Sequence, residues 1–269
     1  LLAGAVQARA VGLTSPERPF LFPMPLALPV VSLMGAIFAG IAGALRTYTG
    51  AHEVITTIML NFVAINITDY LADGPWKDTG IVARTPAIEA SATIPVWGTL
   101  PAGFFIAALM SFATWYLLFR TTLGYEIRTV GLNSNAAHYA GIKVARTIIL
   151  TMAISGFLAG MGGAIETLGV VGRFQPGFNT GLGFDGITIA LLARTNPLGV
   201  IPAALLVGAM QAGSSQMQFD AGVQSQIIDV IQALILFFVS AEMIVRWIIR
   251  TRAEDGGGVT ISTGWGSSS

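Results

Sequence analysis

Long apolar stretches, interrupted by short polar segments, run through most of this chain. An α-helix needs about 20 predominantly apolar residues to cross the hydrocarbon core of a bilayer. Six stretches meet this requirement, whereas a seventh, 184–195, is too short to cross alone, and residues 1–11 form only a stub. The pattern predicts an all-α, polytopic helical membrane protein with about six full spans, a half-span and an N-terminal stub. The predicted full spans are 26–46, 52–72, 99–119, 147–171, 198–217 and 226–249.

Three segments depart from this apolar pattern. Residues 73–98 contain three prolines and several glycines, which favour turns and irregular backbone, so we expect a loop outside the membrane. From about Ala253 the chain is rich in Gly and Ser, a composition typical of disordered tails. We therefore expect a transmembrane domain over 1–252 and a disordered tail over 253–269. Because the chain starts with Leu1 in what resembles the end of a helix, we also expect that N-terminal spans are missing.

The overall composition agrees with a membrane location. Of the 269 residues, 54% are hydrophobic and 10% are charged, whereas about 25% of the residues in soluble domains are charged. The formal net charge is zero, which argues against a nucleic-acid partner. The sequence has no cysteine, which excludes disulfides, thiolate chemistry and cysteine metal sites.

Basic residues concentrate in three places along the chain. Loop 120–146 carries four of them against the single acid Glu126, and the others lie near the C-terminus and between the first two full spans. Cytoplasmic loops of membrane proteins carry an excess of Lys and Arg. We therefore predict that loop 120–146 and the C-terminus are cytoplasmic and that 73–98 and 172–183 face outward. The basic residues are Arg120, Arg128, Lys143 and Arg146, then Arg246, Arg250 and Arg252, and finally Arg46.

Signatures of catalysis and of metal or nucleotide binding are missing from the sequence. The pair His52-Glu53 begins like a zinc-protease motif, but Thr56 occupies the position of the second histidine. No lysine follows a glycine, as a Walker A loop requires, and no nucleophile elbow is present. We therefore expect no enzymatic activity, no metal site and no cofactor bound by this chain.

Polar side chains inside the predicted spans are candidates for a solute pathway. On the helix predicted over 52–72, Glu53, Thr57, Asn61 and Thr68 fall on one face at 100° per residue. Such a stripe can line a polar pathway, or it can form hydrogen bonds between helices. We take Thr57 and Asn61 as pathway candidates and keep interhelical hydrogen bonding as the alternative.

Two carboxylates lie in or beside later spans. Glu166 is close to the expected outer end of its span, where it could line a pathway or reach the interface. Asp185 precedes a short apolar stretch that Asn196-Pro197 interrupts, because proline cannot donate to the helical hydrogen-bond ladder. We predict a short helix near 185–195 and a new helix from about 198. Broken helices occur at transport sites, although packing also produces them, so Glu166 and Asp185 are further pathway candidates.

Small residues recur at a spacing of four on several predicted spans. Such faces allow the backbones of membrane helices to approach closely. We interpret them as packing faces that have no role in contacting solute. They comprise Gly35, Ala39 and Gly43, then Gly156 and Gly160, and finally Ala204, Gly208 and Ala212.

The segment GLNSNAAHYAGI, residues 131–142, is longer than a simple turn in a cytoplasmic loop requires. Asn133 can cap a helix that begins directly after it, and Gly141 can end that helix in a left-handed conformation. The segment therefore predicts a short helix over about Ser134–Ala140, with a low surface of small side chains that a partner protein can approach. We expect this alanine face to be free, so that a bulky charged residue at Ala137 would leave the membrane fold intact. The alanines are Ala136, Ala137 and Ala140.

Three segments together resemble the permease subunits of bacterial ABC importers: AHEVITTIMLNFVA (51–64), TTLGYEIRTVGLNSNAAHYAGIKVART (121–147) and GFDGITIALLARTNPLGVIPAALLVGA (183–209). The nucleoside and simple-sugar group is the most similar, and branched-chain amino-acid permeases are more distant. The resemblance covers about residues 24–240. Such permeases usually have more spans before the first one found in this sequence, which agrees with missing N-terminal spans.

The resemblance implies partners and a site. It implies a permease in the bacterial cytoplasmic membrane that pairs with a second permease subunit and receives solute from an extracytoplasmic binding protein. ATP would be bound by a separate ATPase subunit rather than by this chain. In such permeases a cytoplasmic coupling helix docks into a groove on the ATPase. The matching residues in this sequence are Gly131, Asn133, Ala136, Ala137, Gly141 and Ile142.

The alternative from another class is an ion-coupled secondary transporter that is complete in itself. Such a protein needs ionisable residues inside the membrane to carry ions or protons. The acids in or near the predicted spans that could serve are Glu53, Glu166 and Asp185, and two of them lie near span ends. Reading frames for an ATPase and a lipoprotein beside this one would favour the importer.

Overall fold

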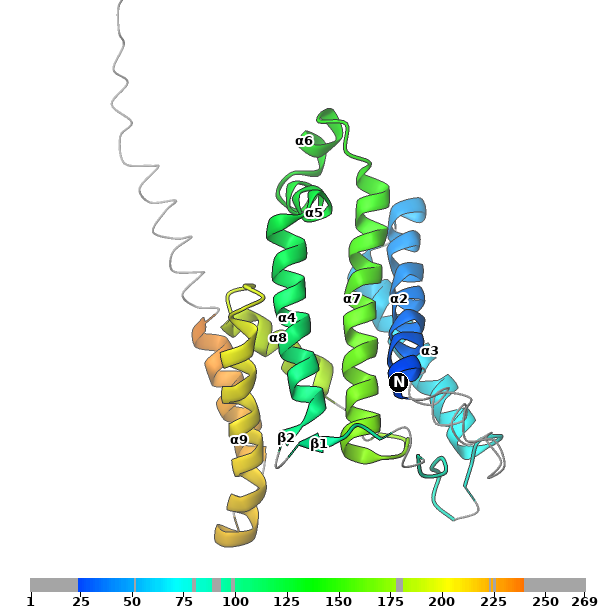
Figure 1. Ribbon diagram of the computed structural model, residues 1–269, viewed down its shortest axis with the longest axis vertical. Coiled ribbons are helices and arrows are strands. Elements are labelled where there is room, and N and C mark those ends of the chain that lie inside the picture. The colour runs from blue at the N-terminus through cyan, green and yellow to red at the C-terminus, as the bar shows by residue number, and fades with distance from the viewer. Residues whose placement is uncertain are drawn as a thin grey trace, which may run out of the picture. The chain divides into compact units, whose positions relative to one another are not determined.

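The computed structural model describes residues 24–50, 52–78, 81–88, 93–97, 100–177, 181–222, 224 and 226–239. The chain divides into two compact units between Gly181 and Leu182 (Figure 1). The predicted N-terminal stub, the predicted tail and the C-terminal basic residues lie outside the described residues.

Within its described residues, the first unit contains four helices that are long and apolar enough to cross a membrane. They match the first four predicted spans to within a few residues. Many of their large apolar side chains are exposed, which suits helices surrounded by lipid tails that are as apolar as leucine. The helices are α2 (Met24–Thr49), α3 (Glu53–Asp73), α4 (Ala102–Arg120) and α7 (Val144–Glu166), and the π-helical turn η1 (Thr167–Val171) extends α7.

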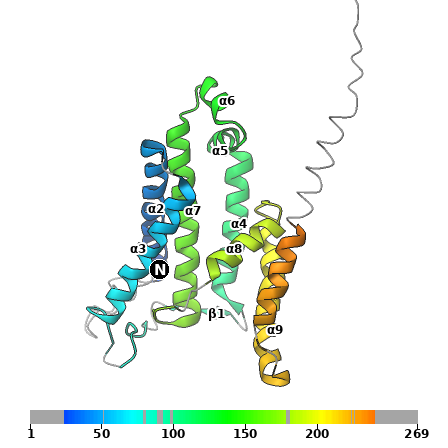
Figure 2. The same ribbon diagram turned by 180° about the vertical axis from the view of Figure 1, so that it is seen from behind.

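Helices α2 and α7 lie side by side along much of their length, as Figures 1 and 2 show. The small-residue faces predicted on these two spans meet at this contact. A Cβ atom on Gly35 would collide with the carbonyl oxygen of Gly156, and a Cβ on Gly156 would collide with Ala39. Val31 and Ala164 are buried beside the crossing. The backbones approach so closely at this crossing that only glycine fits.

The loop predicted over 73–98 folds onto the end of α7 instead of extending freely. The N–H of Ile88 donates to the carbonyl oxygen of Gly172 at 2.9 Å, and the N–H of Ile94 donates to that of Leu168 at 3.2 Å. The side chains of Ile88, Ile94 and Leu168 form a small buried cluster. The loop ends in a pair of two-residue strands, β1 (Val96–Trp97) and β2 (Leu100–Pro101), directly before α4.

Two short helices connect α4 to α7 at the opposite end of the first unit from this loop (Figure 1). They are α5 (Thr122–Leu132) and α6 (Ser134–Tyr139). The short helix predicted over Ser134–Ala140 is therefore confirmed.

The second unit contains α8 (Leu182–Leu192), α9 (Val200–Ala221) and a further apolar helix, Gln226–Val239. The predicted short helix, the break at Asn196-Pro197 and the new helix after it are confirmed. The all-α membrane fold is confirmed as well. However, α9 is not among the helices that are apolar enough to be candidate spans, because its second half carries glutamines, serines and an aspartate. Of the last predicted span, only residues 226–239 are described.

Candidate functional site

The corner between α4 and α5 is fixed by a threonine and a glycine. Thr121 caps α5, because its hydroxyl oxygen accepts the N–H of Gly124 at 3.1 Å. The same hydroxyl donates to the carbonyl oxygen of Leu117 in the last turn of α4 at 2.6 Å. Gly124 is buried directly against the α4 backbone, where a Cβ would collide with the carbonyl oxygens of Leu117 and Leu118. The direction in which α5 leaves α4 is therefore tightly constrained.

A cation–π contact adds to this constraint. The guanidinium carbon of Arg128 on α5 lies 5.0 Å from the ring centroid of Phe119 near the end of α4. Both side chains are exposed, so the contact contributes about 0.5–1 kcal/mol. Because the two residues come from different helices, the contact holds α5 against α4.

Helix α6 begins and ends as its sequence predicts. The side-chain oxygen of Asn133 accepts the N–H groups of Asn135 and Ala136, both at 3.0 Å. At the other end, Gly141 adopts the left-handed conformation with φ of 81°. Its N–H donates to the carbonyl oxygen of His138, and the N–H of Ile142 donates to that of Ala137, each at 3.0 Å. These two bonds form a Schellman motif, which satisfies carbonyl groups left over at the helix end.

The exposed side of α6 differs from the alanine face that we predicted. Ala136 and Ala140 are exposed, but Ala137 is fully buried. Helix α6 packs against both α5 and α7, and Ala137 lies on the covered side. The expectation that a large residue at Ala137 would leave the fold intact is therefore wrong, because no space remains for it.

Two large apolar side chains beside α6 are almost completely exposed. Tyr139, about 200° around α6 from Ala137, is 92% exposed, and Leu132 at the end of α5 is 89% exposed. Sequence reasoning did not single out either residue. The same loop, 120–146, also carries four exposed cationic side chains, those of Arg120, Arg128, Lys143 and Arg146.

The pathway candidates on α3 do not form one continuous stripe. Thr57 and Asn61 are exposed. Thr68, which the helical periodicity places on the same face, is 1% exposed and donates to the carbonyl oxygens of Ala64 and Ile65. Thr68 therefore belongs to the packing of α3. The side chain of Glu53 lies outside the described residues.

The two carboxylate candidates have different surroundings. Glu166 is half-buried at the junction of α7 and η1. In the second unit, Asp185 is also half-buried, and its Oδ2 accepts a hydrogen bond from Nε2 of Gln211 at 2.9 Å. The sequence carried no signal for this pair, because 26 residues separate its members and no helical repeat relates them.

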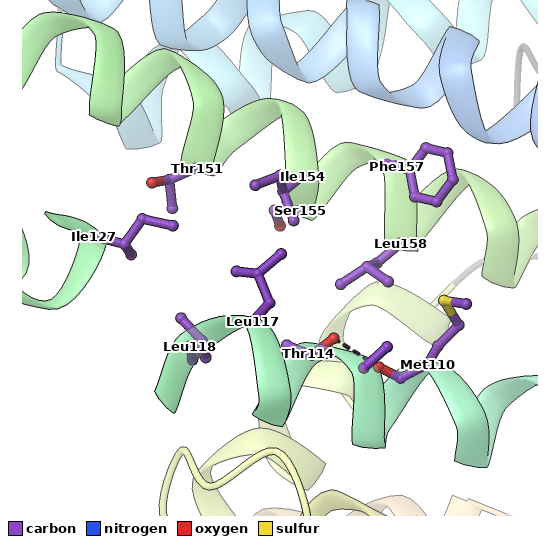
Figure 3. Close-up of a pocket in the computed structure, with 11 residues that line it drawn as sticks. Met110, Thr114, Leu117, Leu118, Ile127, Thr151, Ile154, Ser155, Phe157 and Leu158 are labelled. Atoms are coloured by element: carbon purple, nitrogen blue, oxygen red, sulfur yellow. Dashed lines mark hydrogen bonds between the residues drawn. The ribbon is translucent and has the colours of Figure 1, made fainter. Parts of the chain in front are cut away.

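An apolar cavity of about 410 Å³ lies between α4, α5 and α7 in the first unit (Figure 3). Its lining contains three hydroxyl groups, on Thr114, Thr151 and Ser155. Thr114 donates to the carbonyl oxygen of Met110 at 2.8 Å, and Thr151 donates to that of Thr147 at 2.7 Å, both within their own helices. The lining is otherwise almost entirely aliphatic and aromatic. The cavity therefore offers few polar groups to orient a hydrophilic solute. Among the residues that the structure describes, no cluster of three or more His, Asp or Glu side chains could hold a metal ion.

Comparison with known proteins identifies the family. The model of the family described as "Branched-chain amino acid transport system / permease component" matches residues 2–240. The guanosine ABC transporter permease protein NupP of Bacillus subtilis is 35% identical over 266 residues, which cover 95% of this chain and 75% of NupP. The nucleoside ABC transporter permease protein NupB of Lactococcus lactis is 34% identical over 258 residues, 91% of this chain and 71% of NupB.

A sugar permease is similar to the chain over almost the same length. The glucose ABC transporter permease protein TsgB13 of Haloferax volcanii is 32% identical over 262 residues, 92% of this chain and 69% of TsgB13. No solved structure matches the chain significantly. The chain therefore belongs to this family of ABC transporter permeases and is a multi-pass transport component of the membrane rather than an enzyme.

Proposed function

We propose that this permease moves a nucleoside or a simple sugar into the cell, driven by a separate ATPase subunit. The matches to nucleoside and glucose permeases support this solute class. The observation that carries the proposal is helix α6, which is capped at both ends and bears exposed residues toward solvent. A six-residue helix is too short to persist alone, and α6 is held in place by α5 and α7. Binding of a partner protein to α6 would explain why the fold maintains so short a helix.

The proposed ATPase contact centres on the exposed side of α6. Tyr139 and Leu132 are large apolar side chains that would become buried in a groove of the ATPase. Aromatic anchors that enter a pocket typically dominate the energy of such interfaces. Ala136 and the glycine at position 131 allow the partner to approach closely beside them. Asn133, Gly141 and Ile142 support the helix from its two ends, and Ala137 supports it from beneath.

Helix α5 would transmit a movement of α6 to the membrane-spanning helix α4. The Thr121 and Gly124 contacts and the Arg128–Phe119 contact tie α5 to α4. When ATP draws two ATPase subunits together, α6 would move with its groove and α4 would tilt with α5. Alternating access then follows if the permease has two packing arrangements that the ATPase biases differently.

The orientation follows from the charge of the loops. With loop 120–146 in the cytoplasm, α6 faces the compartment that contains ATP. The loop over 73–98 then lies outside, where an extracytoplasmic binding protein would deliver the solute to a pair of permease subunits in the cytoplasmic membrane. Thr57, Asn61, Glu166 and Asp185 remain our candidates for contacts with the solute, and the C-terminus would be cytoplasmic.

Co-purification of the ATPase with the permease tests the proposal. Ala136→Glu places a bulky charge on the exposed side of α6, and Ala87→Glu makes the same change at an exposed position in the outer loop. We expect Ala136→Glu to weaken ATPase binding by about 30-fold, which corresponds to about 2 kcal/mol for an interface hot spot. Ala87→Glu should leave binding unchanged. Equal ATPase recovery with both variants would contradict the proposal.

A further inference from the structure

Helices α8 and α9 form an antiparallel pair. Asp185 lies in the first turn of α8, whereas Gln211 lies in the middle of α9, yet their side chains are joined by the 2.9 Å hydrogen bond. The chain turns through residues 193–199, and α9 then runs back past α8, to which it is inclined in Figures 1 and 2. Seven residue steps separate Asp185 from the end of α8 at Leu192, a rise of about 11 Å, so the turn begins roughly that far from the level of Asp185.

The polarity of α9 changes at the level of this hydrogen bond. Its first 11 residues, 200–210, contain no polar side chain, whereas the following 11, 211–221, contain six. On α8, the apolar segment 186–192 likewise begins directly after Asp185, with Thr188 as its one hydroxyl. The apolar segment is thus about 10 Å long on α8 and about 16 Å long on α9, at most about half of the roughly 30 Å hydrocarbon core. The polar residues of the second half of α9 are Gln211, Ser214, Ser215, Gln216, Gln218 and Asp220.

Hydrogen bonds within the turn satisfy many of its backbone N–H and carbonyl groups. The N–H of Thr195 donates to the carbonyl oxygen of Ala190, and the N–H of Arg194 donates to that of Leu191, both at 2.9 Å. The side-chain oxygen of Asn196 accepts the N–H of Leu198 at 3.1 Å. Irregular backbone at membrane depth is tolerated where it is buried in protein or lines a water-filled cavity, but not where it faces lipid. This turn has the hydrogen bonds that such a position requires.

The residues at the tip of the turn are polar and conformationally strained. Arg194 and Thr195 have φ angles of 52° and 56°, in the left-handed region that a β-branched residue such as threonine rarely adopts. Arg194, Thr195 and Asn196 are all exposed. A charged side chain at mid-depth in a membrane faces water or a polar partner rather than lipid. The tip therefore requires water or polar protein groups around it.

We propose that residues 182–221 form a re-entrant hairpin, which enters the membrane to about its middle and leaves on the same side. Its tip, Arg194 to Asn196, lines the solute pathway. Because α7 and η1 carry the chain across the membrane from loop 120–146, the hairpin enters from the side opposite that loop, and the polar half of α9 projects there beyond the hydrocarbon. The re-entrant geometry is inferred only from the contacts and polarity of α8 and α9. The role in solute contact rests in addition on the proposed importer function.

The chemistry of the tip indicates the kind of solute that it contacts. The guanidinium of Arg194 has five donors and no acceptor. The hydroxyl of Thr195 donates to the carbonyl oxygen of Arg194 at 2.7 Å and can still accept, and the side-chain amide of Asn196 keeps its two donors. Such a surface matches a solute rich in hydroxyl and carbonyl oxygens. A nucleoside or a sugar has this character, and an apolar amino-acid side chain does not.

Thiol accessibility tests the geometry, and the chain suits the method because it has no cysteine of its own. Thr195→Cys is compared with Ser134→Cys in loop 120–146 and with Gln218→Cys in the polar half of α9, in right-side-out and inverted membrane vesicles. A small charged thiosulfonate and a bulky impermeant maleimide are applied to each variant. We expect Gln218→Cys to react with both reagents from the side opposite Ser134→Cys.

Thr195→Cys should react with the small thiosulfonate and resist the bulky maleimide from either side, and saturating nucleoside should slow its reaction. If Thr195→Cys reacts with the maleimide from the same side as Ser134→Cys, α9 crosses the whole membrane and the re-entrant geometry is wrong. If neither reagent reaches Thr195→Cys, the tip is buried in protein and does not line the pathway. Both outcomes are independent of ATPase binding.

Solute uptake by the complete importer tests the role of Arg194. Arg194→Gln removes the charge, and Arg194→Lys retains it as the matched control. We expect uptake by Arg194→Gln to fall by about tenfold or more, the effect of losing a hydrogen bond from a charged donor, while the ATPase still co-purifies. Uptake of Arg194→Gln equal to that of wild type would refute the solute contact. Loss of ATPase co-purification from the wild-type permease would instead refute the importer proposal itself.

Discussion

The N–H of Ile142 donates to the carbonyl oxygen of Ala137 at 3.0 Å, and this bond reverses the chain directly after α6. Gly141 lies between the two residues in the left-handed conformation that the reversal requires. Ala137 is fully buried at the base of the turn. The buried side of α6 and this turn therefore hold the helix in place and keep Tyr139 on its exposed side.

Replacing Asn133 should loosen α6 without changing its contact surface. Asn133→Ala removes the acceptor for two N–H groups, and loss of such a cap costs about 1 kcal/mol. Asn133→Asp keeps the acceptor oxygen and is the matched control. Hydrogen exchange of the amides in 134–140 should become several-fold faster in Asn133→Ala and stay near wild type in Asn133→Asp. Unchanged exchange in both variants would show that the cap does not hold the helix.

A large substitution at Ala137 should damage the local fold and not only an interface. Ala137→Glu forces a carboxylate into a site with no exposed surface, and overpacking combined with an unpaired buried charge costs about 2–4 kcal/mol. Ala136→Glu, one residue earlier and exposed, should leave the fold unchanged. The thermal midpoint of the detergent-solubilised permease separates the two. Equal midpoints for both variants would contradict the burial of Ala137.

Adding even one methyl group at the crossing of α2 and α7 should destabilise the fold. Gly156→Ala places a Cβ against Ala39 and against the backbone at Gly35, so we expect destabilisation of about 1–3 kcal/mol. Gly162→Ala on the same helix meets nothing within 4 Å, and should be neutral or stabilising by about 1 kcal/mol, the usual effect in a helix. Opposite shifts of the thermal midpoint are therefore expected. A stabilising effect of both changes would show that the helices are not this close.

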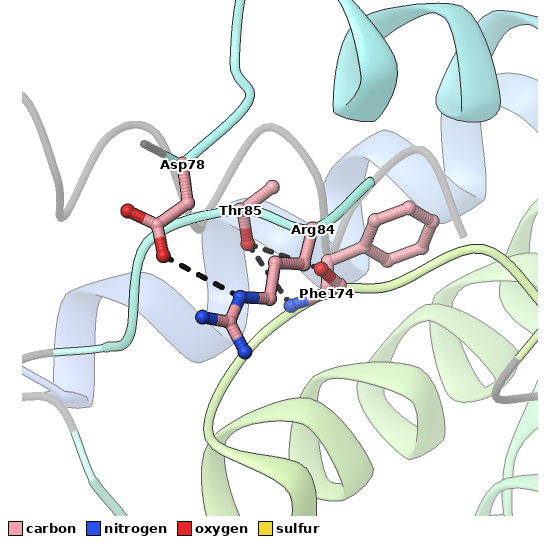
Figure 4. Close-up of polar contacts among 4 residues, drawn as sticks. All are labelled: Asp78, Arg84, Thr85 and Phe174. Carbon is pink, nitrogen blue, oxygen red and sulfur yellow. Dashed lines mark hydrogen bonds and ion pairs between the residues drawn. The ribbon is translucent and has the colours of Figure 1, made fainter. Parts of the chain in front are cut away.

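The outer loop should depend on one threonine hydroxyl. The N–H of Phe174 donates to Oγ1 of Thr85 at 3.0 Å, and the N–H of Thr85 donates to the carbonyl oxygen of Phe174 at 2.9 Å (Figure 4). Both residues are buried, so Thr85→Val leaves the N–H of Phe174 without this acceptor, at a cost of about 1–3 kcal/mol. Thr85→Ser keeps the hydroxyl as the control.

Limited proteolysis of the loop around 81–88 measures this effect. A loop that is held on the end of α7 resists cleavage, and one that detaches is cut. Thr85→Val should be cleaved faster than wild type, and Thr85→Ser should resemble wild type. Identical cleavage of all three proteins would mean that the bond to Phe174 does not anchor the loop.

The elements that the sequence predicted well are those set by nearby residues. Asn133 and Gly141 determine the two ends of α6 through bonds to residues within five positions, so both ends could be predicted. The break at Asn196-Pro197 follows in the same way from the chemistry of proline. The burial of Ala137 could not be predicted, since it depends on how α5 and α7 approach α6.

Contacts between distant residues carried no comparable signal. The bond between Asp185 and Gln211 joins two helices across 26 residues, and Thr85 meets Phe174 across 89. The apolar first half of α9 suggested a full span over 198–217, but the change to polar residues at Gln211 shortens the apolar part. A window that averages over both halves hides this change.

Cross-linking at position 139 tests the central claim that α6 is the contact for the ATPase. Because the chain has no native cysteine, Tyr139→Cys and the outer-loop control Ala87→Cys each carry one thiol. A short thiol-reactive photo-crosslinker is attached to each variant, and the complete importer is illuminated in membranes. We expect a covalent product of the permease and the ATPase from Tyr139→Cys and none from Ala87→Cys. A complex that assembles and hydrolyses ATP but gives no such product from Tyr139→Cys would contradict the proposed role of α6.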